Sequence, residues 1–304
     1  MKYVKLGNSD LLVSKVCLGC MRIASKTVEE VEELVKKALD LGVNFFDHAD
    51  IYGDTTCESI FGEVLKKHPD WREKMIIQTK IGIVKGVMYD FSKERFVNGV
   101  DDALKRLNIS YIDVLLIHRP DALTDWKEVS DTFKILKESG KVRYFGVSNM
   151  NRGQMELFYK FCGFHPVANQ LRLSITHSTM IDQGLFVNRM DNESIGRSDG
   201  ALEYCYLNGI TVEPWSVVMG PERVTFIDDP KFPVLNERLD KLAKKYKVTK
   251  NCIAIAFLTR HPQDLVPIVG TTSPIHLTEM ADAPDIILEK TEWYSLLLHN
   301  KVLP

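Results

Sequence analysis

The sequence is organised around one stretch, Asn44-Phe45-Phe46-Asp47-His48-Ala49-Asp50-Ile51-Tyr52-Gly53-Asp54. It begins as a short apolar run and then turns polar, so a carboxylate ends a buried strand and a tyrosine follows five residues later. A buried polar group costs free energy unless it is paired, and a hydrophobic core has no need of one. We therefore interpret the stretch as a strand that delivers Asp47 and Tyr52 to a functional site.

Two later strands end in the same way. The segment 75–79 is Met-Ile-Ile-Gln-Thr and leads into Lys80, and the segment 112–117 is Ile-Asp-Val-Leu-Leu-Ile and leads into His118. In a barrel of alternating parallel strands and helices, the carboxyl ends of the strands meet at one face, and the active site lies there. The sequence therefore predicts one site built from neighbouring strand ends.

Short apolar segments alternate with amphipathic segments along the whole chain. Residues 3–16 are predicted to form a β-hairpin with its turn at 7–10, and Thr27 with Glu30 forms a capping box that starts the first helix. Core strands are expected at 16–19, 45–46, 75–79, 112–117, 142–147, 167–171, 210–215 and 265–269. Helices are expected from 28 to Gly42, at 58–67, from a Ser92 cap to 107, from 126 to Gly140, at 154–161, in a short segment ending at 207, at 234–246, from a Thr249 cap to 260, and at 291–298.

This alternation predicts a single α/β domain over residues 1–304, a (β/α)₈ TIM barrel with an N-terminal β-hairpin and extra C-terminal helices. A barrel of this kind needs about 250 residues. A doubly wound dinucleotide-binding sheet would carry Gly-x-Gly-x-x-Gly after its first strand, whereas residues 19–22 are Gly-Cys-Met-Arg. Residues 172–198 hold no helical period, and we expect a long functional or mobile loop there.

Composition excludes several classes of protein. The formal net charge is -2 and no basic patch recurs, so we expect no nucleic-acid partner. No apolar run approaches the roughly 18 residues of a membrane span, and the N-terminus lacks the apolar core of a signal peptide. The six cysteines lack metal-ligand spacing, so we expect free thiols, no metal, no membrane contact and a cytoplasmic location.

The four polar residues at the strand ends suit proton transfer. The phenol of tyrosine ionises near pH ~10 in water, and a neighbouring ammonium favours the phenolate. Lys80 could supply that charge, and Asp47 could keep Lys80 in place and protonated. Tyr52 would then act as a general acid while His118 donates a hydrogen bond to the oxygen that gains charge. Each residue alone could have a purely structural role. Four such residues at the ends of neighbouring strands are better explained by one shared functional site.

At these residues the sequence resembles the aldo-keto reductases, and especially bacterial NADP-dependent oxidoreductases of that family. Asn-Phe-Phe-Asp-His-Ala-Asp-Ile-Tyr-Gly at 44–53 matches the family signature. The resemblance implies the catalytic tetrad Asp47, Tyr52, Lys80 and His118. It also implies hydride transfer to an aldehyde or ketone, which becomes an alcohol.

The same resemblance implies where the nicotinamide cofactor binds. Gly146-Val147-Ser148-Asn149 and Asn169-Gln170 are similar to segments that hold the carboxamide, and Trp215 occupies the place of a ring that stacks on nicotinamide. Val266 to Thr271 is similar to the segment beside the adenosine phosphates. The cofactor-binding residues expected in this way are Cys20, Met21, Arg22, Asp47, Ser148, Asn149, Gln170, Trp215, Ser216, Val217, Gly270, Thr271, Thr272, His276 and Glu279.

The segment 270–280 departs from the family pattern. The family commonly has an arginine that binds the 2′-phosphate of NADP, and His276 stands at that position, with Met280 where an Asn is usual. The hydroxyls of Thr271, Thr272 and Ser273 remain as phosphate ligands. We therefore expect that NADPH is the favoured cofactor, that the protein discriminates only weakly between NADPH and NADH, and that NADH is also accepted.

Two other functions remain open from the sequence. Lys80 could be a Schiff-base nucleophile, as in aldolase-type lyases, or the chain could be a non-catalytic nicotinamide-binding regulatory subunit, as potassium-channel β subunits share this fold.

The expected partner is a small-molecule carbonyl substrate. Its identity is expected to depend on the loops 20–24, 83–91, 120–126 and 172–198. Arg22 and Trp126 are candidates for lining those loops, with surface or core roles as alternatives. The oligomeric state is open, and a monomer is compatible with the sequence.

Overall fold

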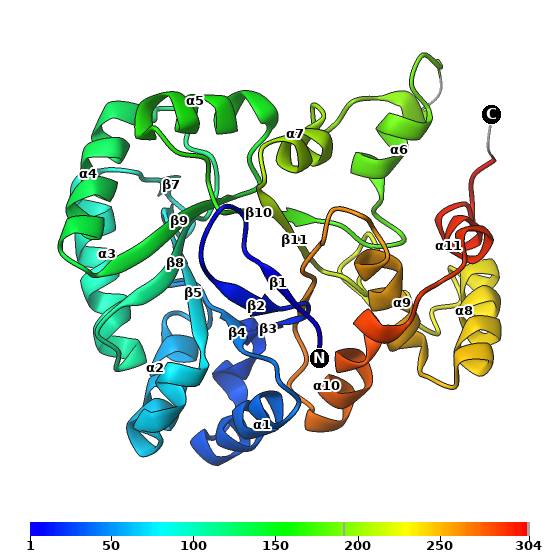
Figure 1. Ribbon diagram of the computed structural model, residues 1–304, viewed down its shortest axis with the longest axis horizontal. Coiled ribbons are helices and arrows are strands. Elements are labelled where there is room, and N and C mark those ends of the chain that lie inside the picture. Colours follow the sequence, from blue (N-terminus) through cyan, green and yellow to red (C-terminus); the bar gives the residue numbers. More distant parts are fainter. Residues whose placement is uncertain (191, 303–304) are drawn as a thin grey trace.

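The computed structural model describes residues 1–190 and 192–302 and contains a (β/α)₈ barrel (Figure 1). Eight parallel strands lie in the order β11-β10-β9-β8-β5-β4-β3-β12. The two ends of this sheet approach each other, and the backbone N–H of Val266 donates to the carbonyl of Val212 at 3.1 Å. The strands are β3 (Cys17–Gly19), β4 (Phe45–Asp47), β5 (Ile76–Ile81), β8 (Ile112–Ile117), β9 (Val142–Ser148), β10 (Ala168–Arg172), β11 (Thr211–Trp215) and β12 (Ile268–Val269).

Successive side chains of a strand point to opposite faces, and this alternation divides the core in two. Phe46, Ile77 and Leu115 belong to the cluster that packs between the strands and the helices. Phe45 and Leu116 belong to a smaller cluster inside the barrel. Both faces of the strands are buried, which explains why they read as continuous apolar runs.

The predicted hairpin closes the amino-terminal end of the barrel (Figure 1). Its strands are β1 (Tyr3–Lys5) and β2 (Leu12–Ser14), and Leu6 and Leu11 are buried in the inner cluster. Gly7 is needed at the turn because its φ is +54° and a Cβ atom would lie 2.2 Å from the carbonyl oxygen of Val167. The hairpin therefore covers the end of the barrel opposite to the carboxyl ends of the strands.

Helices surround the strands, and local capping fixes where several of them begin. Thr27 and Glu30 form the predicted capping box, Ser92 caps α3 as predicted, and Asn151 with Gln154 forms a second box that starts α5. The helices are α1 (Val28–Asp40), α2 (Thr56–Lys67), α3 (Lys93–Leu107), α4 (Trp126–Glu138), α5 (Arg152–Cys162), α6 (Thr179–Leu185), α7 (Ala201–Leu207), α8 (Pro233–Tyr246), α9 (Lys250–Thr259), α10 (Pro274–Ala281) and α11 (Lys290–Leu297), with short 3₁₀ turns η1 (Cys20–Ser25), η2 (Pro69–Lys74), η3 (Asn192–Ser194) and η4 (Ala283–Asp285).

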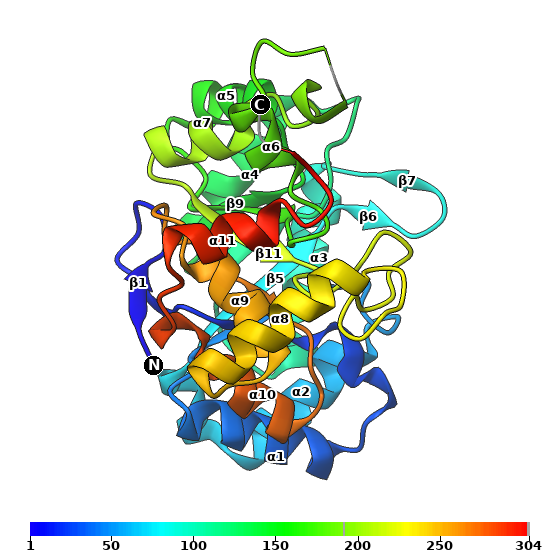
Figure 2. The same cartoon turned by 90° about the vertical axis from the view of Figure 1, so that its right-hand side faces the viewer.

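The structure corrects the sequence reading at three places. The segment 172–198 is not without helix, because it contains α6 and η3, and the ammonium of Lys301 fixes α6 through Asp182 at 2.7 and 2.8 Å. Helix α10 was missed because its eight residues are too few to establish a period. A small hairpin, β6 (Ile83–Val84) with β7 (Met88–Tyr89), was also missed and projects beside the barrel end (Figure 2).

Candidate active site

The residues predicted to act together share one strand face. Phe45, Ile76 and Leu116 point into the barrel. Asp47, Lys80 and His118 each lie two or four residues after one of them, so their side chains point to the same inner face. Because inward residues near the strand ends meet at the barrel mouth, local alternation alone places these side chains together. A cleft of about 620 Å³ opens there. Its walls include Met21, Arg22, Asp47, Tyr52, His118, Ser148, Asn149, Gln170, Trp215, Ser216, Val217, Gly270, Thr271 and His276.

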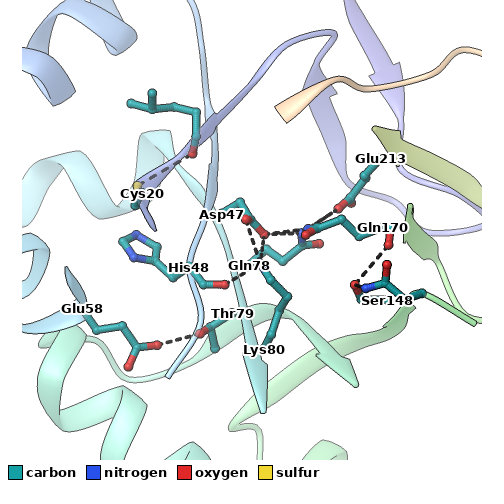
Figure 3. A network of polar contacts seen from close by, with 12 residues as sticks. Cys20, Asp47, His48, Glu58, Gln78, Thr79, Lys80, Ser148, Gln170 and Glu213 are labelled. Carbon is teal, nitrogen blue, oxygen red and sulfur yellow. Dashed lines mark hydrogen bonds and ion pairs between the residues drawn. The ribbon is translucent and has the colours of Figure 1, made fainter. Parts of the chain in front are cut away.

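Lys80 and Asp47 form an ion pair at the bottom of the cleft (Figure 3). The ammonium donates to the two carboxylate oxygens at 2.6 and 2.7 Å and to the backbone carbonyl of His48 at 2.7 Å. Burial alone would lower the pKa of Lys80, but Asp47 and then Tyr52 favour the charged form more strongly, so the pKa is raised above its usual value. The amine is therefore held as an ammonium, and three acceptors satisfy its three donors.

Tyr52 lies between this pair and the cleft. The Lys80 nitrogen is 5.0 Å from the centroid of the Tyr52 ring, and the ring of His118 stands edge-on to it at 6.1 Å. Burial raises the pKa of Tyr52 to about 12, although the Lys80 charge acts in the lowering direction that the sequence suggested. The net shift is upward because desolvation outweighs the ammonium, so the phenol remains protonated at neutral pH.

His118 is neutral. Burial first, and then the charges of Lys80 and Arg119, lower the pKa of His118 to about 2. Its Nδ1 atom is buried without a hydrogen-bond partner. An uncharged imidazole can donate a hydrogen bond into the cleft without competing for the proton of Tyr52.

A second buried carboxylate, Glu213, was missed by the sequence analysis. Gln78 donates from Nε2 to Asp47 Oδ1 at 2.8 Å and to Glu213 Oε2 at 2.7 Å. Gln170 donates to the same two oxygens at 2.9 and 3.1 Å (Figure 3). Burial, and then the charge of Asp47, raise the pKa of Glu213 to about 7. The sequence did contain a signal for it. Glu213 lies two residues before Trp215 on β11, so the two side chains point to the same face of the strand.

The wall formed by β9, β10 and β11 offers hydrogen-bonding groups that suit a nicotinamide carboxamide. Ser148 donates to the backbone of Gln170 at 3.0 Å, and Asn149 donates to Ser148 at 2.7 Å. Asn149 and Ser216 both have φ of +58°, an uncommon conformation for these residues that is often found at ligand sites. Trp215 presents its ring to the cleft, and its Nε1 atom is buried without a partner. These residues fit an aromatic amide ligand.

The segment after β12, which lies beside β11 in the closed barrel, brings Thr271 and His276 to the cleft. Thr271 accepts from the backbone N–H of Ser273 at 3.1 Å, and Ser273 caps α10. The cleft also includes Arg223, from the connection between β11 and α8, which the sequence analysis did not select. Arginine carries a permanent positive charge, whereas the segment 270–280 contains no lysine or arginine.

Four expected residues lie away from the cleft surface. Lys80 is fully buried beneath Asp47, and Cys20 is buried with its thiol 3.7 Å from the carbonyl oxygen of Leu18. Thr272 is not among the cleft-lining residues, and Glu279 lines a separate surface groove between α1 and α10. Of the two loop candidates, Arg22 lies in the cleft and Trp126 packs against Phe158.

Within 1–190 and 192–302, no three His, Cys, Asp or Glu side chains are grouped so that they could hold a metal ion. In the same part of the chain, no helix is both long and apolar enough to cross a membrane.

Comparison with known proteins gives one consistent result. The model of the aldo/keto reductase family matches residues 15–296. A 6-dehydroglucose reductase from Novosphingobium aromaticivorans is 32% identical over 97% of this chain and 94% of its own length. An uncharacterized oxidoreductase from Bacillus subtilis is 32% identical over 94% of each chain. A crystal structure of a thermostable aldo-keto reductase with the inhibitor epalrestat superposes with a TM-score of 0.80 at 25% identity, covering 99% of this chain and 100% of the other.

Proposed function

Because the chain belongs to the aldo/keto reductase family, we propose that it reduces an aldehyde or a ketone to an alcohol with NADPH as the favoured cofactor. One observation carries this proposal: the half-buried phenol of Tyr52 lies between the Lys80–Asp47 ion pair and a cleft that also contains a neutral His118. A phenol so placed can deliver a proton to an oxygen that gains negative charge.

Each of the four residues then has one role. Tyr52 donates its proton to the carbonyl oxygen, and His118 donates a hydrogen bond that orients the same oxygen. Lys80 stabilises the phenolate that remains, since its positive charge lies close to the ring. Asp47 keeps Lys80 charged and fixes its position through two short hydrogen bonds.

The cofactor supplies the hydride, and the residues that would hold it form two groups. Ser148, Asn149 and Gln170 would bind the carboxamide, while Trp215 would stack on the ring. Thr271, His276 and Arg223 would face the phosphates. Hydroxyls and an arginine match the chemistry of phosphate, because the guanidinium donates two parallel hydrogen bonds.

The lyase alternative is disfavoured by the protonation of Lys80. A Schiff-base nucleophile must be a neutral amine, whereas the contacts of Lys80 with Asp47 raise its pKa. The site therefore supports acid catalysis by Tyr52 rather than attack by Lys80.

The test is a direct assay with purified protein. NADPH and NADH are titrated by fluorescence, and a panel of aldehydes and ketones is then screened by loss of absorbance at the nicotinamide band. Saturable cofactor binding with turnover of at least one carbonyl is expected. Tight cofactor binding without turnover of any member of a broad panel would contradict the proposal and favour a regulatory subunit.

A further inference from the structure

Arg119 stands at the mouth of the cleft without an acidic partner. It directly follows His118 at the end of β8 and lines the cleft. Among the described residues it forms no ion pair and no hydrogen bond, and its guanidinium carbon lies 5.9 Å from the centroid of the Trp215 ring. Arg152, by contrast, has a carboxylate partner in Glu156 at 2.8 Å.

The walls around Arg119 contain no carboxylate that could neutralise it. Asp47 is the acidic side chain in the lining, and it is already bound to Lys80 and to two amides. Arg172 lies 5.8 Å from the same Trp215 ring, but it is fixed by a hydrogen bond to the carbonyl of Gly220 at 2.8 Å. The charge of Arg119 is therefore available to a ligand.

The position of Arg119 in the barrel separates it from the expected phosphate site. In the order β12-β3-β4-β5-β8, four steps lead from β12 to β8, the largest separation in a ring of eight strands. The Gly270–Thr271 segment follows β12, whereas Arg119 adjoins His118, whose pKa its charge helps to lower. Arg119 therefore belongs to the side of the cleft where the carbonyl group would lie.

We propose that the carbonyl substrate carries an anionic group, a carboxylate or a phosphate, and that Arg119 binds it. This inference rests on the proposed reductase function and adds the class of substrate. A guanidinium binds either anion through two parallel hydrogen bonds, and it is weakly hydrated, so it loses little on entering a half-buried site.

The first experiment compares carbonyl compounds that differ mainly in charge. The pairs are 4-carboxybenzaldehyde with its methyl ester, succinic semialdehyde with its methyl ester, and glyceraldehyde 3-phosphate with glyceraldehyde. The wild-type protein should show a kcat/KM at least about tenfold higher for the anionic member of one pair, mainly through KM, as expected for a charge-assisted hydrogen bond. The first two pairs report a carboxylate and the third a phosphate.

The second experiment removes the charge. Arg119→Met should lower kcat/KM for the preferred anion by about 10- to 100-fold and change the neutral partner less than threefold. Arg119→Lys should recover part of the preference, because it restores the charge but not the paired donors. Arg152→Met, which removes an exposed arginine on α5, is the matched control and should leave both rates unchanged.

The outcomes separate this inference from the proposed function. Reduction of the neutral carbonyls without any preference for an anion, or an equal loss of both activities in Arg119→Met, would overturn the anionic substrate and leave the reductase intact. Failure to reduce any of the six compounds or a broader carbonyl panel would overturn both.

Discussion

Asp47 and Glu213 accept hydrogen bonds from the same two amide nitrogens, those of Gln78 and Gln170. Two carboxylates are thus joined through two donors in a fully buried region, with one ammonium, that of Lys80, beside Asp47. Glu213 Oε1 and Gln78 Oε1 have no partner, which fits a Glu213 that carries a proton on the free oxygen. The thiol of Cys17 faces the same carboxylates, and burial, then Asp47 and Glu213, raise its pKa.

Glu213→Gln should change how stability depends on pH. A glutamate in an unfolded chain titrates near pH ~4.3, whereas the pKa of Glu213 is raised to about 7 in the folded protein. The folded state therefore binds more protons than the unfolded state between these values. This group makes the free energy of unfolding fall as pH rises through that window, by up to about 1.4 kcal/mol per pH unit.

Glutamine cannot titrate, so the substitution should remove that decline. Urea unfolding at pH 5, 6 and 7 should show the variant gaining stability relative to the wild type as pH rises. Glu63→Gln, at an exposed position on α2, is the control and should follow the wild type. A stability difference that is constant across the three pH values would mean that Glu213 is ionised throughout.

Tyr52→Phe removes a hydroxyl and keeps the ring. We expect kcat for carbonyl reduction to fall by about 10²- to 10⁴-fold, the range of general acid catalysis, while the Kd of NADPH changes little. Tyr206→Phe, at an exposed tyrosine of α7, should retain full activity. Near-normal turnover in Tyr52→Phe would assign the proton donor elsewhere.

Lys80 should not form a covalent adduct with a carbonyl substrate. Its raised pKa keeps it an ammonium, and an ammonium has no lone pair for attack. Borohydride is added during incubation with an aldehyde, and the peptides are mapped by mass. The Lys80 peptide should be unmodified, with the peptide of exposed Lys85 as an internal reference for adventitious labelling. A reduced adduct at Lys80 would favour the lyase chemistry.

Cofactor preference should depend on two positions of the cleft wall. Arg223→Met should weaken NADPH binding by about tenfold, since a charge-assisted contact to phosphate is lost. His276→Arg should tighten NADPH and leave NADH unchanged, because arginine adds a permanent charge that only the 2′-phosphate would use. Dissociation constants of both cofactors for both variants decide the matter. If the ratio of the NADPH and NADH dissociation constants is the same in both variants as in the wild type, the 2′-phosphate binds elsewhere.

The grouping of Asp47, Lys80 and His118 at one end of the barrel could be predicted from the sequence because its signals are local. Asp47, Lys80 and His118 each continue the two-residue alternation of an apolar strand onto the inner face, and parallel strand ends must meet at one rim. The hairpin closed by Gly7 and the capping boxes are local in the same sense. Sequence neighbours therefore determined the barrel and the face on which the polar side chains collect.

The tertiary structure alone decided how those side chains interact. Glu213 lies 135 residues from Gln78 in sequence, and their hydrogen bond depends on the closure of the barrel. Burial beneath the cleft reversed the expected shift of Tyr52, because desolvation depends on everything packed around the ring. The contact of Arg119 with Trp215 joins a residue that follows β8 to the last residue of β11. The electrostatic field, the burial and the hydrogen-bond partners of a side chain all depend on residues that are distant in the sequence. They are therefore determined only when the chain is folded.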